Sequence, residues 1–434
     1  MVTVVGQRVV IYPSHTLRAH FENQLYALLL GGPRIDILSR LPYEIAVYVL
    51  RFVDMSNLCK IALISRAWNQ LSNDNEVWRS VYLYQQQWKI KIPTRKSTLI
   101  NSSKSNSTSK SLVDQLQDLS LSTHSQLNWK QLCHDRKALE SRWRSIPTKT
   151  KLIGHEDSVY CIQFDSTKIV TGSRDQTIKF WDAHTLQCTD TLHGHSQSVL
   201  CLQYNEHRMI SGSSDNTIII WDMETRQPLS RLHGHAAGVL DVCFDDQYII
   251  SCSKDTSIKV WDVNKMVLIR TMTGHRGPVN AVQLHEGQVV SASGDGLVKL
   301  WNVATGVCIR DFVGHERGLA CVQFDGVTIV SGSNDNTIRI WEAATGRCIR
   351  TLTGHEKLVR TLHFDQNRIV SGSYDYTVKV WDVETGECTL DLNDGHVSWV
   401  FDVQFSSSRI ISTSQDKNIV VWDFAGDIDT SLFV

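Results

Sequence analysis

The hydrophobic and polar positions of this chain form one pattern that starts near residue 154 and recurs to the C-terminal end. Its first copy reads GHEDSVYCIQFDSTKIVTGSRDQTIKFWD. Val159–Phe164, Lys168–Ser173 and Thr177–Trp181 are short runs rich in β-branched and aromatic residues, separated by polar turn residues. Such runs predict three β-strands. A further strand-like run, Cys188–Leu192, follows them, so each copy predicts a small four-stranded sheet.

The pattern occurs seven times with nearly constant spacing. Gly-His pairs begin at Gly154, Gly194, Gly234, Gly274, Gly314, Gly354 and Gly395, and the matching tryptophans are Trp181, Trp221, Trp261, Trp301, Trp341, Trp381 and Trp422. A period of about 40 to 45 residues, with Gly-His near the start and Trp-Asp near the end, resembles the WD-repeat family. Asn302 and Glu342 replace the Asp in two copies. The resemblance covers residues 148–424 and implies an all-β propeller of seven blades.

The ends of the repeat region predict how this propeller closes. Eleven residues follow Asp423, and they do not match the fourth strand-like run of the other copies. Residues 148–153, just before the first Gly-His pair, do match it. We therefore expect residues 148–153 to pair with the strands of residues 397–423, because this pairing removes an exposed sheet edge.

Each copy also carries a His, a Ser or Thr, an Asp and a Trp at fixed offsets, which in the first copy are His155, Thr171, Asp175 and Trp181. A Ser-His-Asp hydrolase needs one exposed and strained nucleophile, whereas this set occurs seven times. We expect a buried network that satisfies its own polar groups and joins the strands of a blade. The repeats therefore indicate a non-catalytic protein without cofactor or metal.

Residues 36–92 have a different pattern, with a helical period of about 3.6 residues. The first expected helix opens at Leu41-Pro42, the second has Ser56 as its N-cap and runs to Trp68, and the third covers residues 75–84. The apolar positions are Ile45, Val49 and Phe52 on one side of the first helix, Leu58, Ile61, Ala62 and Ile64 in the second, and Val77, Trp78, Val81 and Tyr82 in the third.

These helices resemble an F-box, a degenerate motif that docks on the Skp adaptor of cullin-based ubiquitin ligases. The resemblance lies in Leu41-Pro42-Tyr-Glu-Ile45, Leu50-Arg-Phe-Val-Asp54, Leu58-Cys, Ser65-Arg-Ala-Trp68 and Trp78. An F-box followed by a linker and WD repeats is a more specific combination than the motif alone. It implies an adaptor-binding face with apolar residues at or just beneath it, namely Leu41, Pro42, Ile45, Leu58 and Trp68.

The remaining segments flank or connect these two regions. Residues 1–35 have no assigned role, and a short helix expected over residues 16–30 either packs on the next element or serves self-association, so a homodimer is an open alternative. Residues 93–125 are expected to form a flexible Ser-rich insertion, for which a phosphorylation target or a basic interaction tail is the alternative. Residues 425–434 form a C-terminal tail.

A linker helix is expected over residues 126–147. Its stripe of side chains repeats at helical spacing and consists of Trp129, Leu132, Arg136, Leu139 and Trp143. The stripe could be a coiled-coil seam, but packing of one helix onto both neighbouring regions is the simpler interpretation.

Composition disfavours nucleic acid and membranes as partners and indicates the cellular compartment. A net charge of -1 and a pI near 7 give no general attraction to nucleic acid or to an anionic membrane. Eleven cysteines without a C-x-x-C pair favour free thiols in a reducing compartment and disfavour zinc. The only apolar run near the start, Leu25–Leu30, is too short for a membrane span. A cytosolic or nuclear protein is expected.

Two sets of residues are expected to supply one rim of the propeller. The first set follows the Val of the first strand, and the second precedes the turn Asp. They are Tyr160, Leu200, Leu240, Asn280, Ala320, Arg360 and Phe401, and Arg174, Ser214, Lys254, Gly294, Asn334, Tyr374 and Gln415. Three of the fourteen are basic and none is acidic. Taken alone, this composition also fits an ordinary solvated rim.

A closer resemblance gives this rim a function. Segments such as Gly172-Ser-Arg-Asp175, Arg317-Gly-Leu-Ala320 and Leu358-Val-Arg360 look like the equivalent segments of the beta-transducin-repeat-containing F-box proteins, copy by copy. In that family the matching positions bind a doubly phosphorylated Asp-Ser-Gly-x-x-Ser degron. The resemblance implies that Arg174, Arg317 and Arg360 clamp phosphate. It further implies Lys254 as a positive charge, Tyr160, Ser198, Ser214, Asn280, Asn334 and Tyr374 as neutral donors, and Gly318, Ala320 and Leu358 as neighbours in the pocket.

The resemblance as a whole implies a substrate receptor of an SCF-type ubiquitin ligase, with the Skp adaptor, a cullin ligase and phosphorylated proteins as partners. One alternative is an F-box propeller that reads phosphothreonine with arginines in two successive copies, but here Ala320 and Phe401 flank Arg360. The other alternative is a scaffold propeller whose rim binds unmodified proteins. The first 30 residues match the family's dimerising segment poorly.

Overall fold

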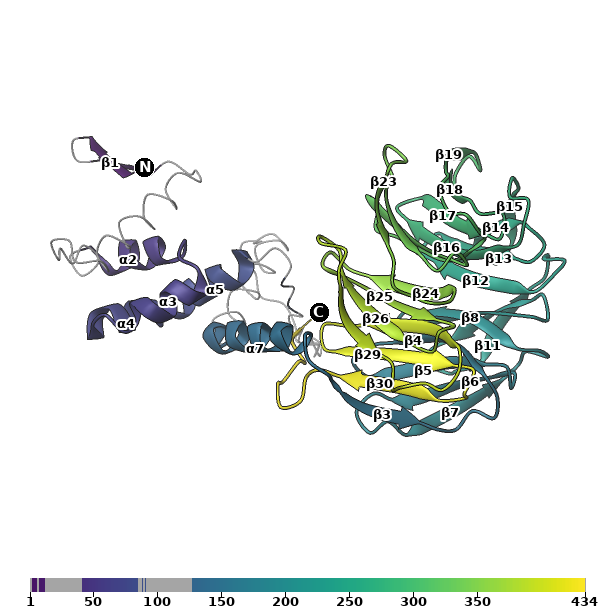
Figure 1. The fold of residues 1–434 in the computed structure, drawn as a ribbon, viewed down its shortest axis with the longest axis horizontal. Helices are drawn as coiled ribbons and strands as arrows, with labels where there is room; N and C mark the ends of the chain where they lie inside the picture. Colours follow the sequence, from purple (N-terminus) through teal and green to yellow (C-terminus); the bar gives the residue numbers. More distant parts are fainter. Residues whose placement is uncertain are drawn as a thin grey trace, which may run out of the picture. The chain divides into compact units, whose positions relative to one another are not determined.

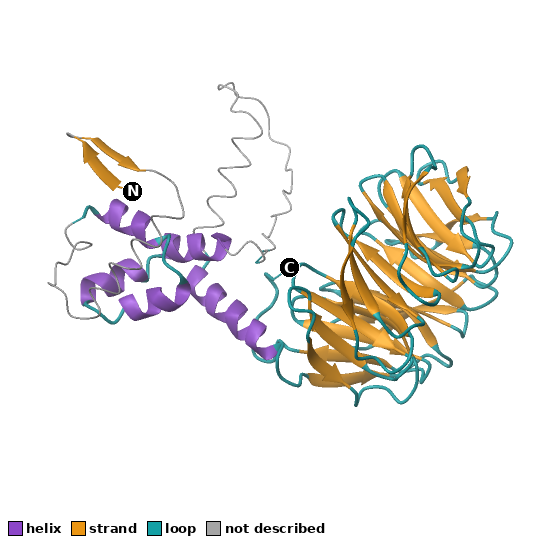
Figure 2. Ribbon diagram, turned by 45° about the horizontal axis from the view of Figure 1, so that its top comes forward, coloured by secondary structure: helices purple, strands orange, loops and turns teal. Residues whose placement is uncertain are grey.

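A computed structural model describes residues 2–5, 8–11, 41–84, 88, 90 and 127–433. It divides into two compact units, a helical unit of residues 1–140 and 428–434 and a propeller unit of residues 141–427 (Figures 1 and 2). The expected linker helix and C-terminal tail are each divided between these units. The helix expected at residues 16–30 and the Ser-rich insertion lie outside the described residues.

The propeller unit consists of seven four-stranded antiparallel sheets (Figure 2). In chain order the first three blades are β4 (Val159–Phe164), β5 (Lys168–Ser173), β6 (Thr177–Asp182) and β7 (Cys188–His193); β8 (Val199–Tyr204), β9 (Arg208–Ser213), β10 (Ile218–Asp222) and β11 (Pro228–Leu232); and β12 (Val239–Phe244), β13 (Tyr248–Ser253), β14 (Ile258–Asp262) and β15 (Leu268–Met272). The strands predicted for the first copy are confirmed to within one residue at each end.

The next three blades repeat the same arrangement. They are β16 (Val279–His285), β17 (Gln288–Ser293), β18 (Val298–Asn302) and β19 (Cys308–Phe312); β20 (Leu319–Phe324), β21 (Thr328–Ser333), β22 (Ile338–Glu342) and β23 (Cys348–Leu352); and β24 (Val359–Phe364), β25 (Arg368–Ser373), β26 (Val378–Asp382) and β27 (Cys388–Leu392). The first strand of each blade contacts the first strand of the next, and β28 returns to β4, so the blades form a closed ring.

The seventh blade joins the two ends of the ring. It contains β28 (Val400–Phe405), β29 (Arg409–Ser414), β30 (Ile419–Asp423) and, from the start of the unit, β3 (Thr148–Leu152). β3 pairs antiparallel with β30, with Thr148 opposite Asp423 and Leu152 opposite Ile419. The predicted closure is therefore confirmed, and its physical reason is that β30 would otherwise expose a row of unpaired backbone groups.

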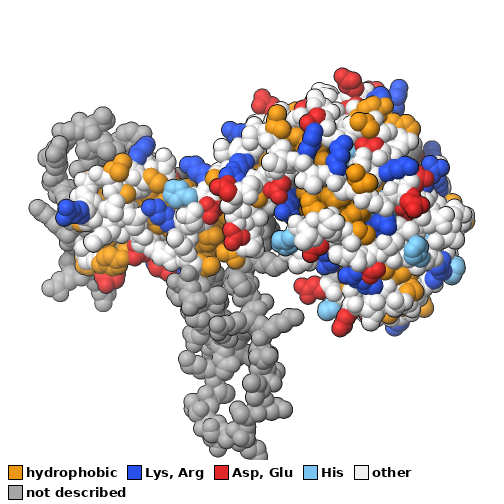
Figure 3. Space-filling view, turned by 90° about the horizontal axis from the view of Figure 1, so that it is seen from below, with side chains coloured by type: hydrophobic (Ala, Val, Ile, Leu, Met, Phe, Trp, Pro, Cys, Tyr) orange, Lys and Arg blue, Asp and Glu red, His pale blue; other side chains and the backbone are white. Residues whose placement is uncertain are grey.

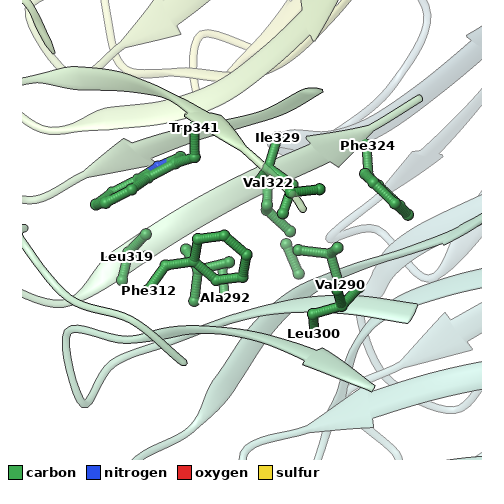
Figure 4. Close-up of a cluster of buried hydrophobic side chains, with 12 residues drawn as sticks. Val290, Ala292, Leu300, Phe312, Leu319, Val322, Phe324, Ile329 and Trp341 are labelled. Atoms are coloured by element: carbon green, nitrogen blue, oxygen red, sulfur yellow. The ribbon is translucent and has the colours of Figure 1, made fainter. Parts of the chain in front are cut away.

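The core of the propeller lies between neighbouring blades. Figure 4 shows one such cluster, in which Phe312 of the fourth blade faces Leu319 and Trp341 of the fifth. The Phe312 and Trp341 rings meet edge to face with centroids 5.9 Å apart. Because each blade covers the apolar face of the next, no blade could bury its core alone.

Polar bridges also join the first strands of neighbouring blades. The side-chain oxygen of Gln163 accepts the backbone N–H of Tyr204 in the next blade, and Gln203 accepts that of Phe244 in the same way, at 2.7 Å. Cys243 stands at the corresponding position of the third blade, where Asp241 bonds the backbone N–H of Val282 at 2.9 Å instead.

Asp402 of the seventh blade makes similar bridges to the first and the sixth blades. Its carboxylate accepts the Ile162 backbone N–H and the Thr361 hydroxyl, each at 2.9 Å. Burial raises the pKa of Asp402 to about 6 and that of Asp241 to about 7. Asp241 thus replaces the glutamine bridge of the third blade. In the seventh blade Asp402 adds to that bridge, because Gln404 still accepts the Phe164 backbone N–H at 3.3 Å.

The His–Ser/Thr–Asp–Trp network forms in all seven blades, as predicted. In the second blade, His195 Nδ1 lies 3.0 Å from Asp215 Oδ2, and His195 Nε2 lies 2.8 Å from Ser211 Oγ. The Trp221 indole N–H donates to the same Ser211 oxygen at 2.9 Å. Because a carboxylate can only accept, Nδ1–H donates to Asp215 and the Ser211 hydroxyl donates to Nε2. Each polar group in this series of hydrogen bonds, from the indole N–H to the carboxylate, thereby has a partner.

The helical unit contains α2 (Tyr43–Leu50), α3 (Met55–Ile61), α4 (Arg66–Ser72), α5 (Asn75–Tyr84) and the first part of α7 (Trp129–Arg142), with the strand pair β1 (Val2–Val5) and β2 (Arg8–Ile11). The prediction for α5 is confirmed, including its four buried side chains. The stripe predicted for the linker helix is also confirmed, because all five of its side chains are buried.

The prediction for the second helix is wrong. The expected second helix is two helices: α3 begins after Asp54, whose carboxylate caps the backbone N–H groups of Ser56 and Asn57, and α4 begins after Ser65. Ser56 is therefore not the N-cap, because an aspartate two residues earlier takes that role. In α2 the buried side chains are Ala46, Val47 and Leu50, whereas Ile45 is exposed. Phe52, which lies beyond the end of α2, is exposed as well.

Candidate functional site

The two expected sets of residues lie on one rim of the propeller. In every blade, the backbone N–H of the residue before the turn Asp donates to the carbonyl of the residue before the first-strand Val. Arg174 bonds Ser158 in this way at 2.8 Å, and Tyr374 bonds Leu358 at 3.1 Å. The same bond joins Ser214 to Ser198 at 3.0 Å. The turn and the start of the first strand are thus held side by side at one end of each blade.

The first set also lines the central channel. The channel walls are built from the first strands of all the blades and include Tyr160, Leu200, Leu240, Asn280, Ala320, Arg360 and Phe401. The side chains vary from blade to blade at these positions, although the strands that carry them are alike. The mouth of the channel is therefore different in each sector of the ring.

One sector of the rim gathers aromatic rings from three blades. Tyr160 of the first blade packs on Phe401 of the seventh, with ring centroids 4.8 Å apart. Tyr374 of the sixth blade stacks on Trp399 at 4.5 Å with an interplanar angle of 3°, and its ring lies 5.9 Å from Phe401. We call these four residues, Tyr160, Tyr374, Trp399 and Phe401, the aromatic sector.

Two of the expected phosphate clamps border the aromatic sector. Burial raises the pKa of Tyr160, and the positive charges of Arg174 and Arg360 oppose that rise, so both guanidinium groups act on this phenol. Arg360 Nη1 donates to the Ala320 carbonyl at 3.3 Å. Arg174 Nε lies 3.7 Å from Asp157 Oδ2, an exposed pair that contributes little to stability. Both arginines keep donors for an anionic ligand.

The other expected site residues lie on the same rim, outside this sector. Lys254, Arg317 and Asn334 are exposed, whereas Ser198, Ser214 and Leu358 are half-buried. Asn280 Nδ2 donates to the Leu319 carbonyl at 2.6 Å. Among the described residues, no ion pair or ring contact joins Arg317 or Lys254 to the aromatic sector.

Gly318 has a steric reason to be glycine. A Cβ atom at this position would lie 2.8 Å from the Gly294 carbonyl oxygen of the preceding blade. Real Cβ atoms do not approach a carbonyl so closely, so a side chain here would push the loops of the fourth and fifth blades apart. Gly318 thus positions the adjacent Arg317 rather than contacting a ligand through a side chain.

The sequence reasoning missed Trp399. It stands where the other six copies carry Ser158, Ser198, Gly238, Pro278, Gly318 and Leu358. That substitution of a large aromatic residue for a mostly small one is the signal that could have found it. Its backbone carbonyl accepts the Gln415 N–H at 2.9 Å, the same bond that places the other rim residues.

Charge is mixed rather than segregated on the face of the propeller unit that Figure 3 shows. Figure 3 shows basic, acidic and apolar side chains interspersed over the visible face of the propeller unit. The described residues contain no group of three or more His, Cys, Asp or Glu side chains placed to hold a metal ion.

The helical unit carries an unusual number of exposed apolar side chains. Ile45 is exposed, Phe52 has an exposed fraction of 60%, and Leu63 reaches 86%. Of the expected adaptor-binding residues, Pro42 is also exposed, Leu41 is half-buried, and Leu58 and Trp68 are buried beneath the surface. Five further exposed positions were not assigned to the adaptor-binding face by the sequence reasoning, namely Tyr43, Tyr48, Ile64, Leu83 and Tyr84.

No helix in the described part of the chain combines the length and the apolar character that crossing a membrane requires. All eleven cysteines occur as free thiols, and six of them are buried.

Comparison with known families agrees with both units. The family described as "WD domain, G-beta repeat" matches residues 146–182, 186–222, 226–262, 266–302, 306–342, 346–382 and 386–423, which together make up more than half of the chain. The family described as F-box-like matches residues 38–84. A solved structure, that of the computationally designed Ika8 protein, is similar with a TM-score of 0.54 and 30% identity, over 63% of this chain and 98% of that one.

Curated relatives share part of the sequence. A protein of Arthroderma benhamiae named "Probable E3 ubiquitin ligase complex SCF subunit sconB" is 30% identical over 158 residues, which are 35% of this chain and 24% of that protein. An F-box protein of Saccharomyces cerevisiae is 29% identical, over 35% of this chain and 24% of that protein. "F-box/WD repeat-containing protein 7" of Drosophila melanogaster is 33% identical, over 36% of this chain and 11% of that protein. The chain thus spans a quarter or less of the length of these three relatives.

Proposed function

Because this chain belongs to the WD-repeat family and carries an F-box-like domain at residues 38–84, we propose that it is the substrate-recognition subunit of an SCF-type cullin ubiquitin ligase. In this role the helical unit binds the Skp adaptor, and the rim of the propeller binds a phosphorylated segment of the substrate. The protein itself transfers no ubiquitin. The names of the relatives, which include an SCF subunit and F-box proteins, support this role.

The observation that carries the proposal is the pairing of arginines with the channel mouth. Arg174 and Arg360 come from different blades, yet both act on Tyr160. A guanidinium group binds phosphate through paired, charge-assisted hydrogen bonds, and each such contact contributes about 1.5 to 3 kcal/mol. Arg360 lines the channel together with Tyr160, and the Arg174 backbone is bonded to Ser158, two residues before Tyr160. Two arginines placed in this way could clamp a phosphoryl group whose remaining oxygens accept from neutral donors.

We assign the second phosphate to the rim of the third and fifth blades. Arg317 and Lys254 are exposed there, in the fifth and third blades, and Ser214 and Asn334 supply neutral donors on the same rim. A ligand with two phosphorylated residues a few positions apart would span the channel between these groups. This arrangement suits the doubly phosphorylated Asp-Ser-Gly-x-x-Ser segment that the sequence resemblance implies.

The adaptor face is assigned to the exposed apolar side chains of the helical unit. Tyr48 and Phe52 are both exposed and their ring centroids lie 5.4 Å apart, so they form a contiguous apolar surface of the kind that marks a protein interaction site. Leu58 and Trp68, which are buried, would shape this face from beneath, whereas Ile45 would contact the adaptor directly.

The phosphate assignment is tested by the affinity of the full-length chain for labelled peptides. Arg360→Ala should weaken binding of a doubly phosphorylated Asp-Ser-Gly-x-x-Ser peptide at least ten-fold and leave the melting temperature unchanged. Arg347→Ala is the matched control, because Arg347 is exposed in the turn between β22 and β23, at the opposite end of the strands. Equal affinity of the parent chain for the unphosphorylated peptide would refute the assignment and favour a scaffold for unmodified partners.

The adaptor assignment is tested by capture of the purified Skp adaptor on the full-length chain. Ile45→Asp should abolish capture without unfolding the chain, because Ile45 is already exposed. Ile349→Asp is the control and should leave capture intact, because Ile349 in β23 is also an exposed isoleucine, at 55% against 43% for Ile45. Undiminished capture by Ile45→Asp would contradict the assignment of this face.

A further inference from the structure

Trp399 is the exception among the tryptophans of this chain. Eleven of the 13 tryptophans are buried and Trp88 is half-buried, whereas Trp399 has an exposed fraction of 37%. Exposing an indole ring forgoes the large stabilisation that its burial normally gives. A tryptophan exposed at a rim where the other blades carry smaller side chains therefore calls for a ligand.

The ring of Trp399 is held in a fixed orientation. Tyr374 stacks on one of its faces with centroids 4.5 Å apart, and Phe401 lies edge-on with its centroid 6.5 Å away. Next to the ring, the Ser398 hydroxyl donates to Gln415 Oε1 at 2.6 Å, which ties the start of the strand to the neighbouring turn. Since Tyr374 covers one face of the indole, the exposed area belongs to its other face and edge.

The surroundings of Trp399 set the chemistry of the occupant. Phe401 lines the central channel, but Trp399 and Tyr374 stand outside that lining. The arginines that border the aromatic sector, Arg174 and Arg360, favour an anionic ligand and disfavour a cation beside the rings. An extended chain advances about 3.3 Å per residue, so the 6.5 Å between the Phe401 and Trp399 centroids corresponds to about two residues.

We propose that Trp399, backed by Tyr374, forms a separate subsite for a large apolar or aromatic side chain that flanks the phosphorylated residues of the bound segment. This inference rests on the proposed function and adds a specificity element to it. The occupant is an extended phosphopeptide with an aromatic side chain a few residues outside the phosphorylated core. An aromatic side chain on the free indole face gains both burial and ring stacking.

The test is a positional scan with the full-length chain. Fluorescein-labelled peptides carry the doubly phosphorylated Asp-Ser-Gly-x-x-Ser core with alanine at each flanking position, and phenylalanine is placed in turn at each of the four positions before and after the core. Fluorescence anisotropy should show one position, or two neighbouring ones, at which phenylalanine tightens binding about five- to twenty-fold. Trp399→Ala should remove this gain and leave the affinity for the all-alanine peptide nearly unchanged.

Two variants separate the subsite from its neighbours. Tyr376→Asn is the matched control, because Tyr376 has almost the same exposed fraction, 38%, and packs on Lys357. Asparagine also tolerates the positive φ of 75° at this position, so the gain from phenylalanine should persist. Arg360→Ala should weaken the alanine and phenylalanine peptides by a similar factor, because it acts on the phosphate.

The outcomes distinguish the two proposals. No gain at any position, or a gain that survives in Trp399→Ala, would overturn the aromatic subsite while leaving phosphate recognition standing. A larger gain from arginine than from phenylalanine at the same position would also overturn it. Equal binding of phosphorylated and unphosphorylated peptides would instead overturn the proposed function.

Discussion

The interior of the blades and the rim of the propeller follow opposite rules. The interior repeats the same residues in every blade, and the His–Ser/Thr–Asp–Trp network is complete in all seven. The rim changes from blade to blade at positions that the same backbone bonds hold in place. A repeated interior makes the fold insensitive to any one rim residue, so the rim is free to specialise.

The largest effect expected from this contrast concerns two tryptophans. Trp341 is 1% exposed and lies in the core between the fourth and fifth blades. Trp341→Ala should lower the free energy of unfolding by about 3 to 5 kcal/mol, because it removes buried area and leaves a cavity. Trp399→Ala at the rim should change it by less than about 1 kcal/mol. Chemical denaturation measures the free energy of unfolding of both variants. Equal losses in the two variants would contradict the contrast between interior and rim.

The second prediction removes one link of the interior network. Ser211→Ala leaves the Trp221 indole N–H and His195 Nε2 without their shared partner, and should lower the free energy of unfolding by about 2 to 4 kcal/mol. Ser211→Thr is the control, because Thr171 occupies this place in the first blade and makes the same bonds. Thermal melting should rank the chains as parent, threonine variant and alanine variant in falling stability.

The third prediction concerns the pH dependence of stability that the buried carboxyl of Asp241 causes. Burial raises the pKa of Asp241 from its ordinary 3.8 to about 7. The folded state then holds a proton that the unfolded state releases, so this contribution to stability is fully present below pH 3.8 and disappears as the pH rises to about 7. Asp241→Asn lacks it. The stability of the variant relative to the parent should therefore increase with pH across this window, by up to about 1.4 kcal/mol per pH unit.

The measurement is denaturant unfolding of both chains at several pH values between 4 and 8. Subtracting the two stability curves removes the opposite pH dependence of the His–Asp networks, in which burial lowers the pKa of His235, His275 and His315. A difference that does not vary with pH would show that Asp241 is ionised in the folded chain at all these values.

The smallest effect on stability is expected at the rim. Arg317 is exposed, so Arg317→Ala should change the free energy of unfolding by no more than about 0.5 kcal/mol. Under the proposed function the same change weakens binding of the doubly phosphorylated peptide about ten-fold or more. Calorimetry and peptide anisotropy on one preparation give both values. A large loss of stability would mean that Arg317 stabilises the fold in the way the interior residues do.

The sequence predicted the propeller well because its signals are local and repeated. Alternation of apolar residues sets each strand, and turn residues set the ends, so β4 to β7 lie where the first copy placed them. The pairing of β3 with β30 followed from counting strands in the last copy. Prediction was weaker in the helical unit, where a short apolar run left open which face packs inward. The buried residues of α2 are Ala46, Val47 and Leu50, whereas Ile45 and Phe52 are exposed.

The sequence by itself determined the seven blades, the closure of the ring, the interior networks and α5, because each depends on residues close in the chain or on a repeat. Only the tertiary structure decided which rim residues meet. Tyr160 and Phe401 lie at opposite ends of the repeat region and come within 4.8 Å because the ring closes between the seventh and first blades. Trp399 and Tyr374 join them from two neighbouring blades. Such contacts depend on the closed geometry of the ring, which no local pattern specifies.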